Sequence, residues 1–177
     1  MLLKGNYIKA KEILKEVYSL IYFKEYMSQK EKELLLIYEP FVLFAIDPKL
    51  LSMKKFIDFK HLITNNLYFA QNKKKMNFNF LLAHYLFLLS LKDFDGLIEL
   101  SITFKNYNYK YFKKTKNKRI YYFIKMLYVL YKTNFNIKLS KLKNENNLEK
   151  MKIIKRGSFH EEIIPFEKLW PMILRAL

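Results

Sequence analysis

Residues 91–135 read LKDFDGLIELSITFKNYNYKYFKKTKNKRIYYFIKMLYVLYKTNF. The segment begins with a polar-aromatic turn, Asp93-Phe94-Asp95, after which Leu97, Ser101 and Phe104 recur at helical spacing. This pattern predicts the turn and second helix of a helical hairpin. The same segment holds most of the excess charge of the chain, because residues 100–144 contain no Asp or Glu.

The composition of the 177 residues favours an all-α fold. With 51% hydrophobic and 28% charged residues, the chain has enough apolar surface to fold and is not disordered by composition. Only 3 Gly and 4 Pro are present, too few for the tight turns of an all-β fold. We predict one α-helical domain, residues 1–177, built from antiparallel helical hairpins.

The chain has no cysteine, which excludes a disulfide framework, a thiolate metal site and a cysteine nucleophile. A reducing compartment fits this composition, and we expect a cytoplasmic location. Charged residues interrupt the amino-terminal segment, which lacks the apolar core of a signal peptide. The longest apolar runs, 34–46 and 78–91, are shorter than the roughly 20 residues that cross a bilayer. They predict buried helices and no transmembrane segment.

A second turn of the same kind lies near the start, where Gly5-Asn6-Tyr7 precedes Ala10, Leu14 and Val17. Both turns resemble the turn and second helix of a tetratricopeptide (TPR) unit. The aromatic turn residues Phe94 and Phe135 are 41 positions apart, a longer repeat than the 34 residues of a standard unit. The resemblance implies a short, irregular solenoid of stacked hairpins that binds proteins. The first helix of the first unit would precede Met1, so we expect the chain to begin inside a repeat.

Local signals predict several helix boundaries. Ser28 and Glu31 have the spacing of a capping box, which predicts a helix from about residue 29. Pro40 predicts that this helix is either kinked near Tyr38 or split into two. Asp47-Pro48 predicts another helix start, with the following helix continuing toward Phe69.

The remaining boundaries concern loops and the carboxyl end. The polar run at 72–76 predicts a loop inside the domain. Residues 138–147 are polar and Asn-rich, and 145–177 predict a less regular cap. Within that cap we expect a short final helix, Met172–Leu177, with Trp170, Ile173 and Leu174 packed against the preceding hairpin.

The residue types that carry catalysis are scattered and mostly have structural explanations. His160-Glu161-Glu162 lacks the second histidine of a zincin motif, and His84 lies in an apolar run typical of a core helix. Asp93 and Asp95 occupy a turn, where Asp caps helices. With no glycine-rich phosphate loop and no nucleophile elbow, we predict no enzymatic activity, no cofactor and no metal site.

The basic segment supplies the candidate binding site for an anion or a partner. Lysines there could neutralise phosphates while aromatic rings stack on unpaired bases. The alternative is that Tyr111, Phe112, Phe123, Leu127 and Leu130 form a core and the lysines only solvate it. AT-rich codon usage would also raise the lysine content, although it does not explain the missing acids. The candidate residues are Lys105, Tyr107, Tyr109, Lys110, Lys113, Lys114, Lys116, Lys118 and Arg119.

Two functions therefore follow as hypotheses. The first is a non-enzymatic protein–protein interaction module, a TPR-like scaffold or adaptor with a basic surface at 105–119. The alternative is a basic module that associates with RNA or with the ribosome. The helical repeat favours a partner protein, and the basic charge favours RNA.

Overall fold

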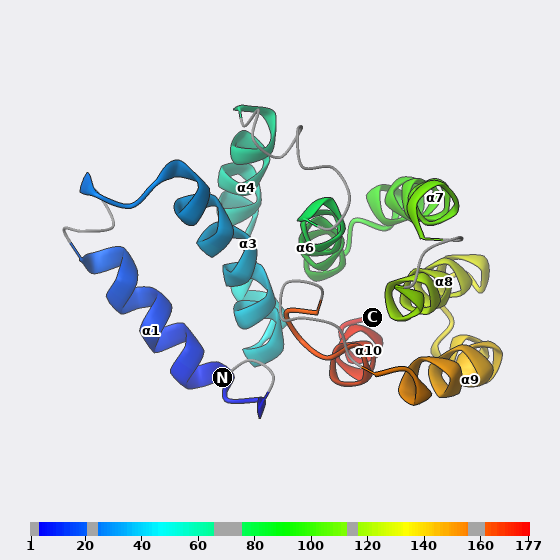
Figure 1. Cartoon of the computed structure of the whole chain (residues 1–177). Helices are drawn as coiled ribbons and strands as arrows, with labels where there is room; N and C mark the ends of the chain where they lie inside the picture. Colours follow the sequence, from blue (N-terminus) through cyan, green and yellow to red (C-terminus); the bar gives the residue numbers. More distant parts are fainter. Residues whose placement is uncertain (1–3, 21–24, 66–75, 113–116, 156–161) are drawn as a thin grey trace. The chain divides into compact units, whose positions relative to one another are not determined.

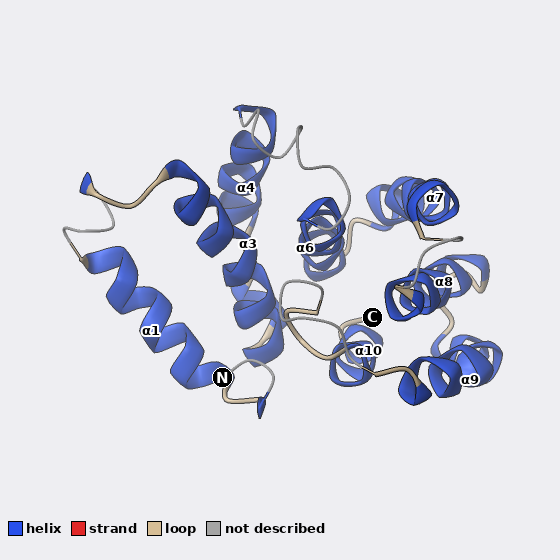
Figure 2. Cartoon of the chain, viewed as in Figure 1, coloured by secondary structure: helices blue, strands red, loops and turns tan. Residues whose placement is uncertain are grey.

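A computed structural model of the chain describes residues 4–20, 25–65, 76–112, 117–155 and 162–177. In these ranges it contains eight α-helices, one 3₁₀-helix and no strand, which confirms the all-α prediction (Figure 2). None of these helices is long and apolar enough to cross a membrane. The chain divides into two compact units, Met1–Leu91 and Lys92–Leu177. Whether they form the single domain expected from the sequence stays a prediction.

In its described residues, the first unit holds four α-helices and one 3₁₀-helix; Figure 1 shows their arrangement within the unit. Helix α3 packs against α1, α6 and the 3₁₀-helix. The predicted loop at 72–76 lies outside the described residues, except for Met76, which begins α6. The elements are α1 (Tyr7–Ser19), α3 (Gln29–Ile46), η2 (Pro48–Leu50), α4 (Met53–Asn65) and α6 (Met76–Ser90).

Two of the predicted helix starts in this unit are confirmed. Ser28 and Glu31 form the capping box at α3: the Ser28 side chain accepts from the Glu31 amide at 3.3 Å, and the Glu31 carboxylate accepts from the Ser28 amide at 2.9 Å. Asp47 caps a helix whose first residue is Pro48, but this helix is a single 3₁₀ turn. The α-helix that follows, α4, starts only at Met53.

Pro40 does not split α3, so that alternative was wrong: the helix runs unbroken from Gln29 to Ile46. An interior proline costs about 3 kcal/mol of helix stability. Buried apolar side chains lie on both sides of it, with Ile37, Phe41 and Phe44 each no more than 2% exposed. Packing of this apolar face offsets the lost backbone hydrogen bond.

Aromatic rings join α4 to α6 in the first unit. Phe59 of α4 stacks on Phe80 of α6 at 4.9 Å between ring centroids, and Phe56 stacks on Phe87 at 5.4 Å. Most side chains of α6 from Phe78 onward are buried, which confirms the prediction of a buried helix. His84 lies on α6 with its ring 5.3 Å from that of Phe56, in keeping with a packing role.

The second unit holds α7 (Phe94–Tyr111), α8 (Lys118–Lys132), α9 (Ile137–Ile153) and α10 (Phe166–Arg175). Helix α8 packs against both α7 and α9, and Figure 1 shows the three as successive neighbours. Side-chain contacts give the register. Asn108 bonds to the Tyr121 carbonyl and Lys105 lies over Tyr128, so α7 and α8 are antiparallel.

The turn between α8 and α9 has the aromatic residue that the sequence pattern marked. Asn134 and Phe135 both have positive φ, 50° and 58°, and Asn136 caps α9. The Thr133 and Ser140 hydroxyls are 2.5 Å apart, and the Asn144 amide donates to the Met126 carbonyl, so α8 and α9 are also antiparallel. The ring of Phe135 packs on Phe94 at 5.3 Å, which brings two of the repeat-marking residues into contact.

The carboxyl end is more regular than the sequence indicated. Helix α9 continues through the Asn-rich segment to Ile153, and the last helix begins at Phe166 and passes Pro171, not at Met172 as expected. Helix α10 starts early and continues past Pro171 because its apolar side chains recur at helical spacing and form one buried face. The buried residues of α10 are Phe166, Leu169, Trp170, Ile173 and Leu174.

Candidate anion-binding face

Six of the nine candidate residues lie in the described part of the chain, on two helices. Lys113, Lys114 and Lys116 lie outside the described residues. Helix α7 carries Lys105, Tyr107, Tyr109 and Lys110, and the first turn of α8 carries Lys118 and Arg119. All of the described candidates except Arg119 keep some surface exposure.

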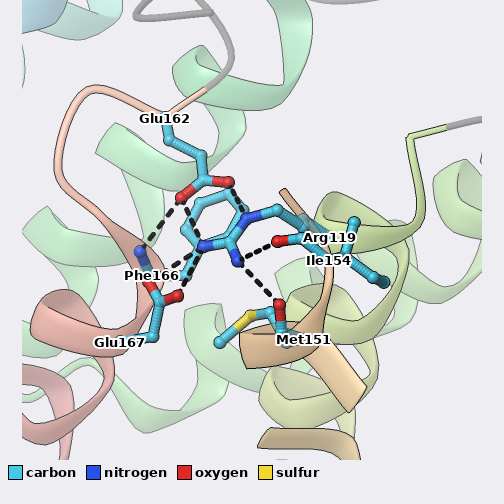
Figure 3. A network of polar contacts seen from close by, with 6 residues as sticks. All are labelled: Arg119, Met151, Ile154, Glu162, Phe166 and Glu167. Carbon is cyan, nitrogen blue, oxygen red and sulfur yellow. Dashed lines mark hydrogen bonds and ion pairs between the residues drawn. The ribbon is translucent and has the colours of Figure 1, made fainter. Parts of the chain in front are cut away.

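Arg119 is not part of a binding surface, which corrects the sequence-based assignment. Its side chain is 2% exposed and lies among two carboxylates and two backbone carbonyls (Figure 3). Its Nε and Nη2 donate to Glu162, the latter at 2.9 Å, and Nη2 also donates to both oxygens of Glu167 at 2.8 Å. Every donor of this guanidinium is satisfied inside the protein.

The remaining nitrogen of Arg119 holds the end of α9. Nη1 donates to the carbonyl oxygens of Met151 at 2.6 Å and Ile154 at 3.0 Å, at the end where a helix leaves carbonyls without intrahelical partners. The Met151 carbonyl also accepts from the Ile154 amide at 3.3 Å. Glu162 in turn accepts from the Phe166 amide at 3.3 Å. Arg119 therefore joins the start of α8 to the end of α9 and the start of α10.

The electrostatics of this cluster favour the charged guanidinium. Burial lowers the pKa of Arg119, but the hydrogen bonds that it donates to Glu162 and Glu167, together with their negative charges, outweigh burial and raise it. No local sequence pattern indicates this cluster, because Glu162 and Glu167 lie 43 and 48 positions from Arg119. From charge alone, Arg119 is indistinguishable from the exposed lysines of the same segment.

A pocket between α7 and α8 collects a different set of basic and aromatic residues. Its volume is about 450 Å³, and of the candidates that the structure describes it includes Lys105 and Tyr109 alone. Among the described residues that line it, none is acidic. They are Lys105, Asn106, Asn108, Tyr109, Tyr121, Ile124, Lys125 and Tyr128.

The lysines of this face lie over tyrosine rings. Lys105 and Lys132 approach the ring of Tyr128, with Nζ at 5.3 and 5.7 Å from its centroid. Lys125 and Lys118 approach Tyr121 in the same way, at 4.9 and 5.5 Å. Cation–π contacts hold the ammonium groups near the protein surface while they remain positive. Two rings thus gather four positive charges on one side of the α7/α8 pair.

Burial divides the pocket into a floor, walls and a rim. Ile124 is fully buried and Asn108 is 6% exposed, so these two form the floor, while Tyr121 and Tyr128 are half-buried walls. Lys105, Asn106, Lys125 and Tyr109 form the rim, and Tyr109 is 71% exposed. We call these eight residues the Lys–Tyr pocket.

Asn108 lies at the floor with half of its amide satisfied. Its Nδ2 donates to the Tyr121 carbonyl at 3.2 Å. Its Oδ1 is buried and has no hydrogen-bond partner among the described residues. The Tyr121 carbonyl fixes the orientation of the amide, since exchanging the two atoms would set two oxygens against each other.

Tyr107, Lys110 and the predicted core residues lie away from this pocket. Tyr107 packs on Tyr111 at 4.7 Å and on Phe112 at 5.6 Å, and Lys110 lies over the Tyr111 ring. Burial, and to a lesser degree Tyr111, raise the pKa of Tyr107, so its hydroxyl stays neutral. Phe112, Phe123, Leu127 and Leu130 are buried, as the core interpretation predicted, whereas Tyr111, assigned to the same core, is half-buried. The core interpretation therefore accounts for the buried faces of these helices, and binding through their lysines stays a prediction.

Tyr121, Lys125 and Tyr128 line the pocket but are absent from the residues predicted from the sequence. Their signal is present, because residues 121, 125, 128 and 132 share one face of a helix opposite the apolar positions 123, 127 and 130. No three His, Asp or Glu side chains in the described ranges are grouped as a metal site requires. The described surface offers the Lys–Tyr pocket as the candidate site.

Comparison with known proteins found no matching family model, no matching curated protein and no matching solved structure.

Proposed function

We propose that this chain is a non-enzymatic binding module that holds a polyanionic partner on the α7/α8 face of its second unit. The observation that carries the proposal is the Lys–Tyr pocket itself, where two lysines meet and none of the eight described lining residues is acidic. Positive charges gathered without counter-charges repel one another, and a polyanion relieves that repulsion. In this proposal the module works in the cytoplasm.

Two classes of partner meet this requirement, each for a different reason. TPR-like hairpins favour an acidic segment of another protein, because stacked helices present grooves for peptides. The chemistry of the pocket favours single-stranded RNA, because tyrosines and lysines together are typical of surfaces that bind unpaired strands. In either case the face is a lysine surface, since Arg119 is engaged internally. Lysine acts as a point charge and reads neither partner by bidentate geometry.

A salt titration of binding tests the proposal. Fluorescence anisotropy would follow a labelled oligouridylate dodecamer and a labelled dodeca-aspartate between low and moderate salt. For the RNA, each lost phosphate contact lowers the log–log slope by about 0.7. We expect Lys105→Gln with Lys125→Gln to lower that slope by about 1.4, and to weaken binding of whichever polyanion is the partner.

The matched control removes two exposed lysines of the first unit, Lys9→Gln with Lys54→Gln. It changes the net charge by the same amount and should leave the slope almost unchanged. If neither polyanion binds the intact chain at low salt, or if both pairs of substitutions weaken binding equally, the α7/α8 face is not the binding site.

A further inference from the structure

The floor of the Lys–Tyr pocket distinguishes between polyanions. A buried acceptor without a hydrogen-bond partner costs about 1–3 kcal/mol, so the unpartnered Asn108 Oδ1 favours a ligand that brings an N–H or O–H group. A carboxylate side chain has only acceptors and cannot satisfy this oxygen. The lysines at the rim, by contrast, require negative charge. A ligand that fits the pocket therefore carries a hydrogen-bond donor and a negative charge close together.

The walls add a third requirement, a flat apolar group. Tyr121 and Tyr128 present ring surfaces on one side of α8, and Tyr109 faces solvent at the rim. Stacking of a base on an aromatic side chain is worth about 1–3 kcal/mol and does not depend on which base it is. Of the polyanions considered, only a nucleic acid joins a flat ring, ring or amine N–H groups and phosphates in one repeating unit.

We infer that the Lys–Tyr pocket receives one unpaired nucleobase of a single RNA strand. The base stacks against the tyrosines and donates an N–H group to Asn108 Oδ1, while its flanking phosphates lie beside Lys105 and Lys125. Because this oxygen has almost no water-accessible surface, neighbouring side chains must change rotamer before a base can reach it. Such rotamer changes occur within nanoseconds. The inference rests on the proposed polyanion site and specifies its ligand.

Three probes of equal length separate the contributions. An oligouridylate dodecamer carries phosphates, rings and the N3–H donor; the same strand built from 3-methyluridine lacks that donor; inorganic polyphosphate of about the same length lacks bases altogether. We expect oligouridylate to bind roughly tenfold more tightly than polyphosphate at equal salt, as stacking of one base predicts. We expect the methylated strand to bind several-fold more weakly than the unmodified one.

Tyr109→Leu gives a test that does not disturb the core, because this side chain is 71% exposed. The matched control is Tyr26→Leu in the first unit, where the tyrosine is 69% exposed. We expect Tyr109→Leu to weaken RNA binding about fivefold without affecting polyphosphate binding, and Tyr26→Leu to change neither. Circular dichroism would show that both variants keep the helical fold.

Failure of this inference can be told apart from failure of the proposed function. Equal affinity for RNA and polyphosphate, with no effect of Tyr109→Leu, would overturn the nucleobase site and leave the polyanion site standing. Binding of dodeca-aspartate alone would do the same in favour of a protein partner. Binding of no polyanion at low salt would overturn both.

Discussion

Replacement of Arg119 by methionine should be among the most destabilising single changes in the second unit. Methionine keeps most of the length and apolar character of the side chain but removes the charge. Glu162, which is 3% exposed, would then be a buried carboxylate without its cation. Removing one partner of a buried ion pair typically costs about 3–5 kcal/mol of unfolding free energy. The carbonyls of Met151 and Ile154 would each lose one hydrogen bond as well.

Urea unfolding followed by circular dichroism would measure this cost. The double variant Arg119→Met with Glu162→Gln removes both charges, so it should recover a large part of the lost stability. The control is Lys125→Met, an exposed cation on the same helix, for which we expect a change within about 0.5 kcal/mol. A loss below about 1 kcal/mol for Arg119→Met, or additive losses in the double variant, would refute the assignment of Arg119 to a buried structural pair.

Two further predictions concern the helix cap and the buried tyrosines. Ser28→Ala should lower the unfolding free energy by about 1 kcal/mol, because it removes the side-chain acceptor of the α3 capping box, and an unchanged urea midpoint would contradict this. Burial raises the pKa of Tyr18, with a further rise from Glu39, and burial also raises that of Tyr85. Because their pKa values are higher in the folded state, these tyrosines add stability below pH 10, and this contribution is lost as the pH rises above 10. Absorbance at about 295 nm should show fewer ionised tyrosines in the folded chain than in urea at the same alkaline pH, and identical titration curves would refute this.

Features that depend on a few neighbouring residues could be predicted from the sequence. The Ser28–Glu31 capping box and the Asp93 cap each join atoms only three residues apart, so the spacing alone predicts the hydrogen bonds. The contact between Phe94 and Phe135 follows from turns at the same end of antiparallel helices. Such local rules also predicted the all-helical class.

Features that depend on tertiary packing were predicted less well. Pro40 was predicted to kink or split a helix, and the last helix was predicted to start after Pro171. Both prolines lie inside helices because the buried side chains around them outweigh the cost of a proline. Arg119 was predicted to be a surface cation because its carboxylate partners are distant in the sequence. No prediction from the sequence included Tyr121 or Tyr128, because only the packing of α7 on α8 shows that they line a pocket with Lys105.

Amide chemical shifts would test the central claim, that the α7/α8 face is the binding surface, most directly. An oligouridylate dodecamer would be titrated into the ¹⁵N-labelled chain at low salt. We predict that the largest shift changes cluster at residues 105–109 and 121–128, with little change in α1 or α4. Changes of similar size throughout the basic residues of the chain, or changes centred on the first unit, would contradict the account.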